Sequence, residues 1–266
     1  MANAALVIDN LAESAMIGAS SQELTMPVSL LRTPTPSQRW RSLSPADWFV
    51  ADKGAAIAAD TVLLSGLTCG VNALVRLRLS SIDATGVAGD ILDTGPIASG
   101  ASPAFDIEYR AFLWLLSAPA AWRYTRFDIA DPDADYVEAG CLVEGVREAF
   151  TYNFAPGDTI QHVDRSRVSP TASGITMTWD DNSFRRLGLS FNAVTSAQRY
   201  GLIERLDRVK GRKRNVLLIT DPDSENLPRD SILGLVTEQT PVAFSNAFAV
   251  DGRPLFGKQL RIDERI

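Results

Sequence analysis

Histidine and cysteine are scarce in this chain of 266 residues, which has one histidine, His162, and two cysteines, Cys69 and Cys141. Metal centres and acid–base sites usually need several such side chains close together. The sequence also lacks a G-x-S-x-G turn, a P-loop and a G-x-G-x-x-G segment. We therefore expect no enzyme, no cofactor and no metal centre, and we interpret His162 as a structural residue. A carboxylate pair that hydrolyses glycans is the weakest alternative.

Excess positive charge and long apolar runs are missing as well. The net charge of −6 argues against nucleic-acid binding, which needs a basic face for the phosphates. No apolar run reaches the roughly 18 residues that cross a bilayer, so we expect no membrane insertion. The first residues, MANAALVIDNLAES, lack the basic segment of a signal peptide. We therefore expect synthesis in the cytoplasm, with Cys69 and Cys141 as core thiols, although a disulfide between them stays open.

Short strand-like runs, separated by Gly, Pro, Ser and Asp, fill the first half of the chain. The run 74–79, LVRLRL, alternates apolar side chains that face a core with arginines that face out. Pro119 is expected to close a strand over 110–117. Further strands are expected at 61–66, 90–95, 122–129 and 136–143. This pattern predicts a β-sandwich or jelly roll over residues 1–145.

The second half, residues 146–266, combines strands with one helix over 195–210. Thr195 and Gln198 have the spacing of a capping box at the start of that helix. Its apolar stripe is Leu202, Ile203, Leu206 and Val209, and Glu204 and Arg208 are spaced to pair on the other side. Strands are expected at 148–154, 159–168, 174–179, 184–194, 216–219, 230–238, 242–250 and 255–262. The chain is thus predicted to be mainly β, in two units.

An acidic cluster is the one candidate for a metal site. Asp131, Asp133, Asp135 and Glu138 lie close together in sequence, and Ca²⁺ prefers several oxygen ligands. The spacing is not that of an EF-hand. A solvated turn is the favoured interpretation.

Aromatic residues near the first strands are candidates for sugar binding, because sugar rings stack on flat side chains. Trp40, Arg41 and Trp48 form this set. The structural alternative, a tryptophan that fills the end of the sandwich core, is favoured for Trp40.

A basic run follows the expected helix in this acidic chain. It consists of Lys210, Arg212, Lys213 and Arg214. A contact with an acidic neighbouring subunit is one interpretation. A solvated loop is another, and nucleic-acid binding is the least favoured.

Several segments of the first half resemble galactose-binding-like jelly rolls of the discoidin kind. The similarity begins at Ile17-Gly18-Ala19-Ser20-Ser21 and continues through Arg39-Trp40-Arg41-Ser42. It extends to the runs 62–66, 75–80 and 122–132. The resemblance implies a sandwich for this half that either contacts glycans or is purely architectural.

Most of the chain also resembles minor tail or distal-tail proteins of long-tailed phages and prophages. The later segments that carry this likeness are 136–145, 153–157, 185–187 and 216–222. The resemblance implies a distal-tail-like β domain, a closed ring of copies (a hexamer, or a trimer) and a place in the virion tail tip. The implied partners are the tail tube, the tape measure, the baseplate hub and host-surface glycans. The family usually has its ring domain first, whereas here the jelly roll comes first.

Three function hypotheses follow from these patterns. The leading one is a virion structural protein of the distal tail or baseplate, whose second half forms the ring. The second is a free carbohydrate-binding module, and the third is a glycan-degrading enzyme.

Overall fold

The computed structural model describes residues 2–170, 175–210, 213–249 and 252–265. Strands make up most of its regular structure, and the one expected helix is present. The mainly β fold class with sandwich-like sheets is therefore confirmed. No helix in the described ranges is long and apolar enough to cross a membrane.

Two compact units divide the chain. The first comprises residues 2–149 with Val216–Ser231, and the second comprises Phe150–Asn215 with Ile232–Arg265. The segment Val216–Ser231 thus lies with the first unit, although the sequence pattern had assigned it to the second half. A domain boundary at residue 145 stays a prediction.

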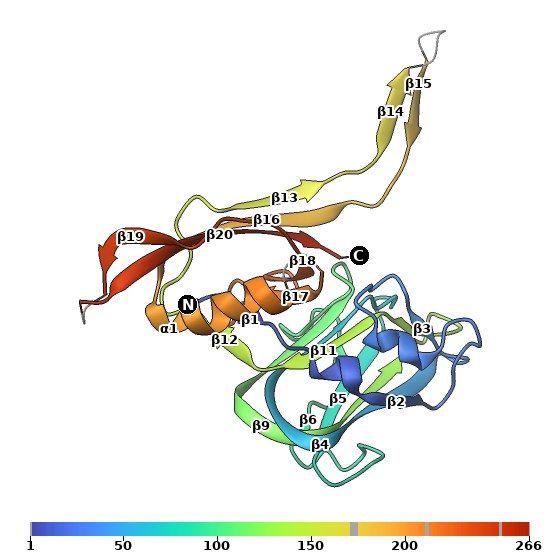
Figure 1. Ribbon diagram of the computed structural model, residues 1–266. Coiled ribbons are helices and arrows are strands. Elements are labelled where there is room, and N and C mark those ends of the chain that lie inside the picture. The colour runs from blue at the N-terminus through green and yellow to red at the C-terminus, as the bar shows by residue number, and fades with distance from the viewer. Residues whose placement is uncertain (1, 171–174, 211–212, 250–251, 266) are drawn as a thin grey trace. The chain divides into compact units, whose positions relative to one another are not determined.

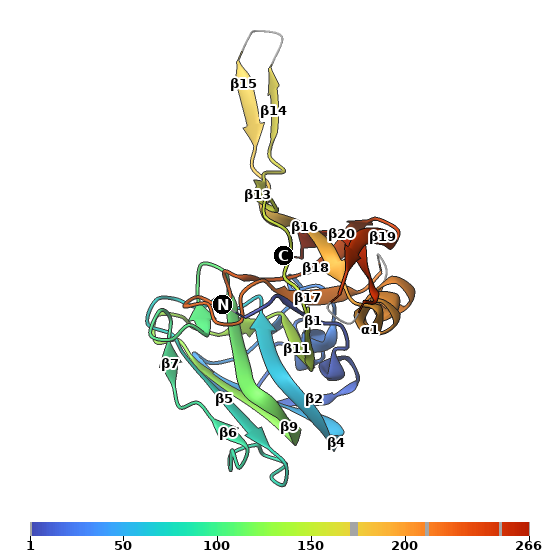
Figure 2. The same cartoon turned by 90° about the vertical axis from the view of Figure 1, so that its left-hand side faces the viewer.

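A strongly twisted antiparallel sheet forms most of the first unit (Figure 2). Its strand order is β11 (Cys141–Gly145), β4 (Ala46–Ser65), β9 (Ala111–Ala130), β5 (Leu74–Ser80) and β6 (Leu92–Asp93). Shorter strands pair along it, namely β2 (Met16–Ala19) with β4, β7 (Ile97–Ala98) with β5 and β8 (Phe105–Asp106) with β9. Two further groups complete this unit: β3 (Trp40–Arg41) with β10 (Glu138–Ala139), and β1 (Ala5–Val7) between β12 (Arg147–Ala149) and β17 (Asn215–Ile219).

The sheet core is closed by two short 3₁₀ turns and the β3–β10 ribbon. The turns are η1 (Leu11–Ser14) and η2 (Val28–Arg32). Phe49, Phe112 and Phe127 are buried at the centre, where their rings contact one another. Val75, Leu77 and Leu79 of β5 are 0% exposed, which confirms the alternation expected for the run 74–79.

One expectation about strand breaks is wrong. Pro119 does not end a strand, because β9 runs without a break from Ala111 to Ala130. The ladder between β4 and β9 shifts register between Ala59 and Thr61, which pair with Ala120 and Leu115. Pro119 lies in this irregularity, where no ladder hydrogen bond requires the backbone N–H that proline lacks.

The second unit contains a second antiparallel sheet, covered on one face by a helix (Figure 1). The order is β18 (Ser231–Gln239, apart from its first residue), β20 (Pro254–Glu264), β16 (Phe184–Val194) and β13 (Thr159–Val163), with β19 (Ala243–Phe248) also on β20. A separate hairpin of β14 (Arg167–Pro170) and β15 (Thr176–Trp179) lies between β13 and β16 in the sequence. Phe150 stacks on Phe191 in the core, with ring centroids 3.9 Å apart.

The helix begins where the capping box predicts. Thr195 accepts a hydrogen bond from the Gln198 backbone N–H, and the Gln198 side chain accepts one from the Thr195 backbone. The helix consists of α1 (Ser196–Gln198) and two π-helical segments, Arg199–Ile203 and Leu206–Lys210. Leu202, Ile203 and Leu206 are buried as expected, and Arg208 pairs with Glu204 at 2.9 Å. The Val209 side chain lies outside the described residues.

Candidate ligand-binding face of the first unit

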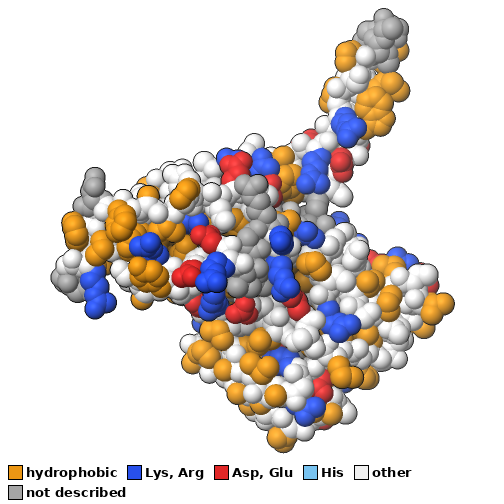
Figure 3. All heavy atoms as spheres, in the orientation of Figure 1, with side chains coloured by type: hydrophobic (Ala, Val, Ile, Leu, Met, Phe, Trp, Pro, Cys, Tyr) orange, Lys and Arg blue, Asp and Glu red, His pale blue; other side chains and the backbone are white. Residues whose placement is uncertain are grey.

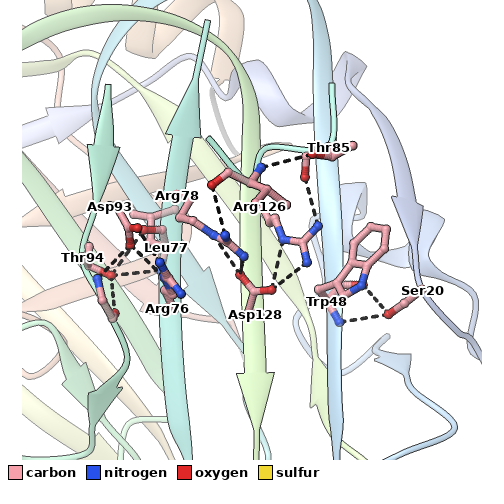
Figure 4. Close-up of polar contacts among 12 residues, drawn as sticks. Ser20, Trp48, Arg76, Leu77, Arg78, Thr85, Asp93, Thr94, Arg126 and Asp128 are labelled. Atoms are coloured by element: carbon pink, nitrogen blue, oxygen red, sulfur yellow. Dashed lines mark hydrogen bonds and ion pairs between the residues drawn. The ribbon is translucent and has the colours of Figure 1, made fainter. Parts of the chain in front are cut away.

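The outer face of the large sheet gathers charged side chains beside a tryptophan (Figure 4). The strand register brings them together, since Asp128 on β9 is opposite Trp48 on β4 and opposite Arg76 on β5. Arg78 is opposite Arg126 in the next row of the same face. Side chains alternate between the two faces of a sheet. The side chains of Trp48, Arg76, Arg78, Arg126 and Asp128 therefore all lie on the face opposite the core, next to one another.

Asp128 lies at the centre of the group and accepts hydrogen bonds on both carboxylate oxygens. Arg78 donates to Oδ2 from Nε (3.2 Å) and Nη2 (2.6 Å). Arg126 donates to Oδ1 from Nε (3.0 Å) and Nη2 (2.8 Å). Such charge-assisted bonds fix the planes of both guanidinium groups.

A third arginine extends the group towards β6. Arg76 donates from Nε and Nη2 to the two oxygens of Asp93, at 2.8 and 2.5 Å. This bidentate pair lowers the pKa of Asp93 to about 2, chiefly through the hydrogen bonds from Arg76. The Arg76 side chain is 37% exposed, so part of its donor edge faces solvent.

The loop between β5 and β6 accepts hydrogen bonds from Arg78 and Arg126. The carbonyl of Thr85 accepts from Arg126 Nη1 (3.0 Å), and the carbonyl of Val87 accepts from Arg78 Nη1 (3.1 Å). Gly86, between them, has φ +67°, and a Cβ there would lie 2.7 Å from Cβ of Arg126. Only glycine adopts this backbone at such close approach without strain.

Trp48 forms one side of the face. The guanidinium of Arg126 lies 4.1 Å from the centroid of the Trp48 ring, within cation–π range. The backbone of Trp48 is anchored to Ser20, whose hydroxyl donates to the Trp48 carbonyl and accepts from its N–H, both at 3.1 Å. The indole itself remains partly exposed.

A pocket of about 350 Å³ lies against this group. Its polar side chains include Asp128, Arg76 and Arg78, and Trp48 supplies an aromatic surface. The remaining lining is mostly apolar, from Ala46, Leu74, Pro96, Ile129 and Ala130. An apolar floor with a few fixed polar groups is the usual composition of a small-molecule site.

The structure separates the three residues expected to bind sugar. Trp48 lines the pocket, whereas Trp40 is 0% exposed and its Nε1 donates to the carbonyl of Ser21 at 3.0 Å. The assignment of Trp40 to a binding surface is therefore corrected, because a core side chain offers no face to a ligand. Arg41 is engaged by Glu138 at 2.6 Å and lies over the Tyr136 ring.

The acidic cluster is not assembled as a calcium site in the described residues. Asp131 is 2% exposed and accepts from the Gly70 backbone N–H at 2.7 Å, and Asp133 accepts from the Asn72 side chain at 2.7 Å. Glu138 is held by Arg41 and by Thr68. No three carboxylates from the set, which includes Asp135, come together in a geometry for a metal ion in the described part of the chain.

The basic run is only partly described. Lys213 and Arg214 are exposed, whereas Arg212 and the side chain of Lys210 lie outside the described residues. Its role as an assembly contact stays a prediction.

The histidine and the two cysteines lie in different surroundings. His162 is exposed on β13 rather than buried. Cys69 and Cys141 are thiols, and burial, assisted by the charge of Asp131, raises the pKa of Cys69 to about 12. Within the described ranges, no group of histidine, cysteine and acidic residues has the geometry of a metal centre.

Sequence reasoning did not identify Arg76, Arg78, Arg126 or Asp128 as site residues. The outward arginines of the run 74–79 were a visible signal, because two charges on one strand face need partners across the sheet. Their partner strand, β9, could not be identified from local pattern alone.

Comparisons with protein-family models and with curated proteins find no match. Solved structures similar to this chain include a chitosan-binding module of a chitosanase/glucanase from Paenibacillus sp. IK-5, with 14% identity, 52% of this chain and 98% of that chain covered, and a TM-score of 0.39. A Streptococcus pneumoniae fucose-binding module has 9% sequence identity and a TM-score of 0.38. The match covers 55% of this chain and 100% of that chain. The lectin domain of Lectinolysin, complexed with Lewis B antigen, has 10% sequence identity and a TM-score of 0.39. The match covers 53% of this chain and 98% of that chain. Similarities at this level assign neither a family nor a ligand to the chain.

Proposed function

We propose that the first unit is a galactose-binding-like module that binds a saccharide in the pocket beside Trp48. The observation that carries this proposal is the combination of an aromatic surface with Arg78 and Asp128 in one pocket. Arg126, which does not line the pocket, holds Asp128 in place. A sugar ring offers an apolar face to an indole and hydroxyl groups to charged side chains held in a fixed plane. Arg76, which is partly exposed, supplies further donors at the rim.

The wider role that we propose is that of a structural protein in the tail tip of a phage. The resemblance to distal-tail proteins supports it, and so does the division into two β-rich units. In this role the second unit builds the ring of copies, next to the tail tube, tape measure and baseplate hub. The first unit contacts glycans on the host surface, and the protein belongs to the virion after synthesis in the host cytoplasm.

Binding to oligosaccharides tests the first part of the proposal. A library of bacterial surface oligosaccharides identifies a soluble ligand, and calorimetry then gives the affinity per site for the whole chain. Trp48→Ala should weaken binding about tenfold or more, since aromatic contacts contribute about 1 kcal/mol beyond their buried area. Tyr152→Ala, which removes an exposed aromatic side chain of the second unit, is the matched control. Binding that is absent, or equally strong in Trp48→Ala, would refute the saccharide site.

Mass spectrometry of purified virions from a producing phage or prophage tests the second part. The chain should be present in intact particles, and labelling should place it at the tail tip. Its absence from virions would refute the structural role and leave a free carbohydrate-binding module as the alternative.

A further inference from the structure

The hairpin of β14 and β15, called the arm here, has no other strand beside it in the described residues. Every residue of its two strands is exposed. An isolated two-stranded hairpin is only marginally stable in water. The arm therefore lacks the burial that usually stabilises a strand pair.

One face of the arm carries two large apolar side chains beside Ser169 and Arg167, which lie opposite them on β14. Met177 and Trp179 are two positions apart on β15 and so share a face, and they are 49% and 51% exposed. Asp180 and Asp181 come directly after Trp179, and both are exposed. The arm thus presents a tryptophan that lies between Arg167 of the neighbouring strand and the two carboxylates that follow it.

A second exposed apolar surface, called the β19 patch, lies elsewhere in the same unit. It consists of Tyr200, Phe244 and Phe248, which are 65%, 73% and 67% exposed. β19 is an edge strand, which pairs with β20 alone in the described ranges, and edge strands that display large apolar side chains favour association. Figure 3 shows hydrophobic side chains gathered both along the arm and over β19.

The β19 patch carries a cation, Arg199, that the two carboxylates after Trp179 can neutralise. The guanidinium of Arg199 lies 4.4 Å from the ring centroid of Phe256 and 5.7 Å from that of Phe244. The same guanidinium lies 5.0 Å from the ring centroid of Tyr200. A cation held against aromatic rings gains most from an anion that arrives at the same surface.

The two surfaces lie at opposite ends of one sheet. The arm joins the sheet where β13 ends, at Val163, and β16 begins, at Phe184. These two residues are opposite each other in the β13–β16 pair. β19 pairs with β20 at Phe256, which is opposite Val194 at the other end of β16. The arm of one copy therefore cannot reach the β19 patch of the same copy, because the length of β16 separates them. The arm of a neighbouring copy can reach it.

We infer that the second unit binds a second copy of this chain head to tail, with the arm of one copy on the β19 patch of the next. Trp179 packs against Phe244 and Phe248, and Asp180 or Asp181 pairs with Arg199. Because two different surfaces meet, the contact is heterologous, and repetition builds either a closed ring or a filament. This deepens the assembly role proposed above, on which it rests, by naming the surfaces that meet.

Sedimentation velocity of the full chain across a wide concentration range tests the inference. The wild-type protein should form oligomers larger than a dimer. Trp179→Ser and Phe244→Ser should each weaken self-association roughly thirty-fold or more, as truncating an interface hot spot does. Trp48→Ala, on the sheet of the first unit, is the matched control and should associate as the wild type does.

Mixing the two variants gives the sharper result. A Trp179→Ser copy keeps its β19 patch and a Phe244→Ser copy keeps its arm, so the mixture should form dimers that grow no further. Arg199→Glu should dissociate the oligomer, and adding Asp180→Arg and Asp181→Arg to the same chain should restore it. Circular dichroism confirms that each variant is folded.

Two outcomes would overturn the inference. A wild-type chain that is monomeric at every concentration has no such contact. Oligomers that persist in both single variants are held by other surfaces, which leaves the proposed assembly role in place. Saccharide binding at the Trp48 pocket is measured separately and is unaffected by either outcome.

Discussion

The guanidinium of Arg126 lies 4.1 Å from the centroid of the Trp48 ring while its Nε and Nη2 donate to Asp128. One side chain thus orients both the aromatic and the acidic part of the pocket. Lysine keeps the positive charge but lacks the planar guanidinium from which Nε and Nη2 both donate to Asp128 Oδ1. The two residues are therefore not interchangeable at this position.

Arg126→Lys should reduce saccharide affinity about tenfold while the fold is retained, because Asp128 Oδ1 loses a charge-assisted hydrogen bond worth about 1.5–3 kcal/mol. The emission of Trp48 should change at the same time, since the cation above its ring is displaced. Calorimetry and fluorescence of the whole chain measure the two effects. An unchanged affinity would show that Asp128 is positioned by Arg78 alone.

Gly86→Ala should disturb the same group through the backbone. The added Cβ would lie 2.7 Å from Cβ of Arg126, and φ is +67°, so we expect a loss of about 1–3 kcal/mol in unfolding free energy and weaker saccharide binding. Gly100→Ala is a matched control, since Gly100 has φ +72° but no atom within 4 Å of its added Cβ. Only Gly86→Ala should affect binding. Equal effects would mean that backbone strain, and not contact with Arg126, dominates.

The acid stability of the first unit should depend on two carboxylates near this loop. Hydrogen bonds from Ser80 and Ser81 lower the pKa of Asp90 to about 2, and Arg76 lowers that of Asp93 to about 2, from 3.8 for the unperturbed group. A lowered folded-state pKa adds stability that is complete above the unfolded value and is lost as the pH falls through the folded value. The unfolding free energy should therefore decrease from about pH 4 to about pH 2.

Denaturant unfolding across this window measures the effect, and Asp90→Asn should flatten part of the decrease. A wild-type stability that is constant over the window would contradict the assignment. The exposed position of Asp90 limits the size of the change, because solvent screens such interactions.

Local patterns predicted the strands and the helix start well. The alternation of Val75, Leu77 and Leu79 and the Thr195–Gln198 capping box both depend on neighbours in sequence, so they could be read directly. The strand break expected at Pro119 failed because a register shift removed the hydrogen bond that proline would have interrupted.

Pairing between strands that are far apart in the chain could not be predicted from the sequence. β1 pairs with β17 across more than two hundred residues of chain, with Ala5 opposite Ile219, and nothing local specifies this. The candidate site depends on the same kind of pairing, because Asp128 meets Trp48 and Arg76 only once three strands are aligned. Trp40 and Trp48 also look alike in sequence, yet one is in the core and the other lines the pocket.

A buried ion pair near Trp122 offers a separate test of how the first unit is stabilised. Lys53 Nζ lies 3.0 Å from Glu144 Oε2, with side chains 1% and 0% exposed. The ammonium also lies 3.9 Å from the centroid of the Trp122 ring, whose Nε1 donates to the same carboxylate at 3.2 Å. Burial lowers the pKa of Lys53, and the charge of Glu144 opposes that shift.

Removing either partner should be costly, whereas removing both should not. Lys53→Met leaves a buried carboxylate whose Oε1 already lacks a hydrogen-bond partner, and we expect a loss of about 3–5 kcal/mol in unfolding free energy. Glu144→Gln leaves a buried ammonium and should cost a similar amount. The double variant should be within about 1 kcal/mol of the wild type, because the desolvation of both charges is then avoided. Denaturant unfolding of all four proteins closes a double-mutant cycle. Additive losses would mean that the two charges stabilise the fold independently, through Trp122 and the surrounding core, rather than through each other.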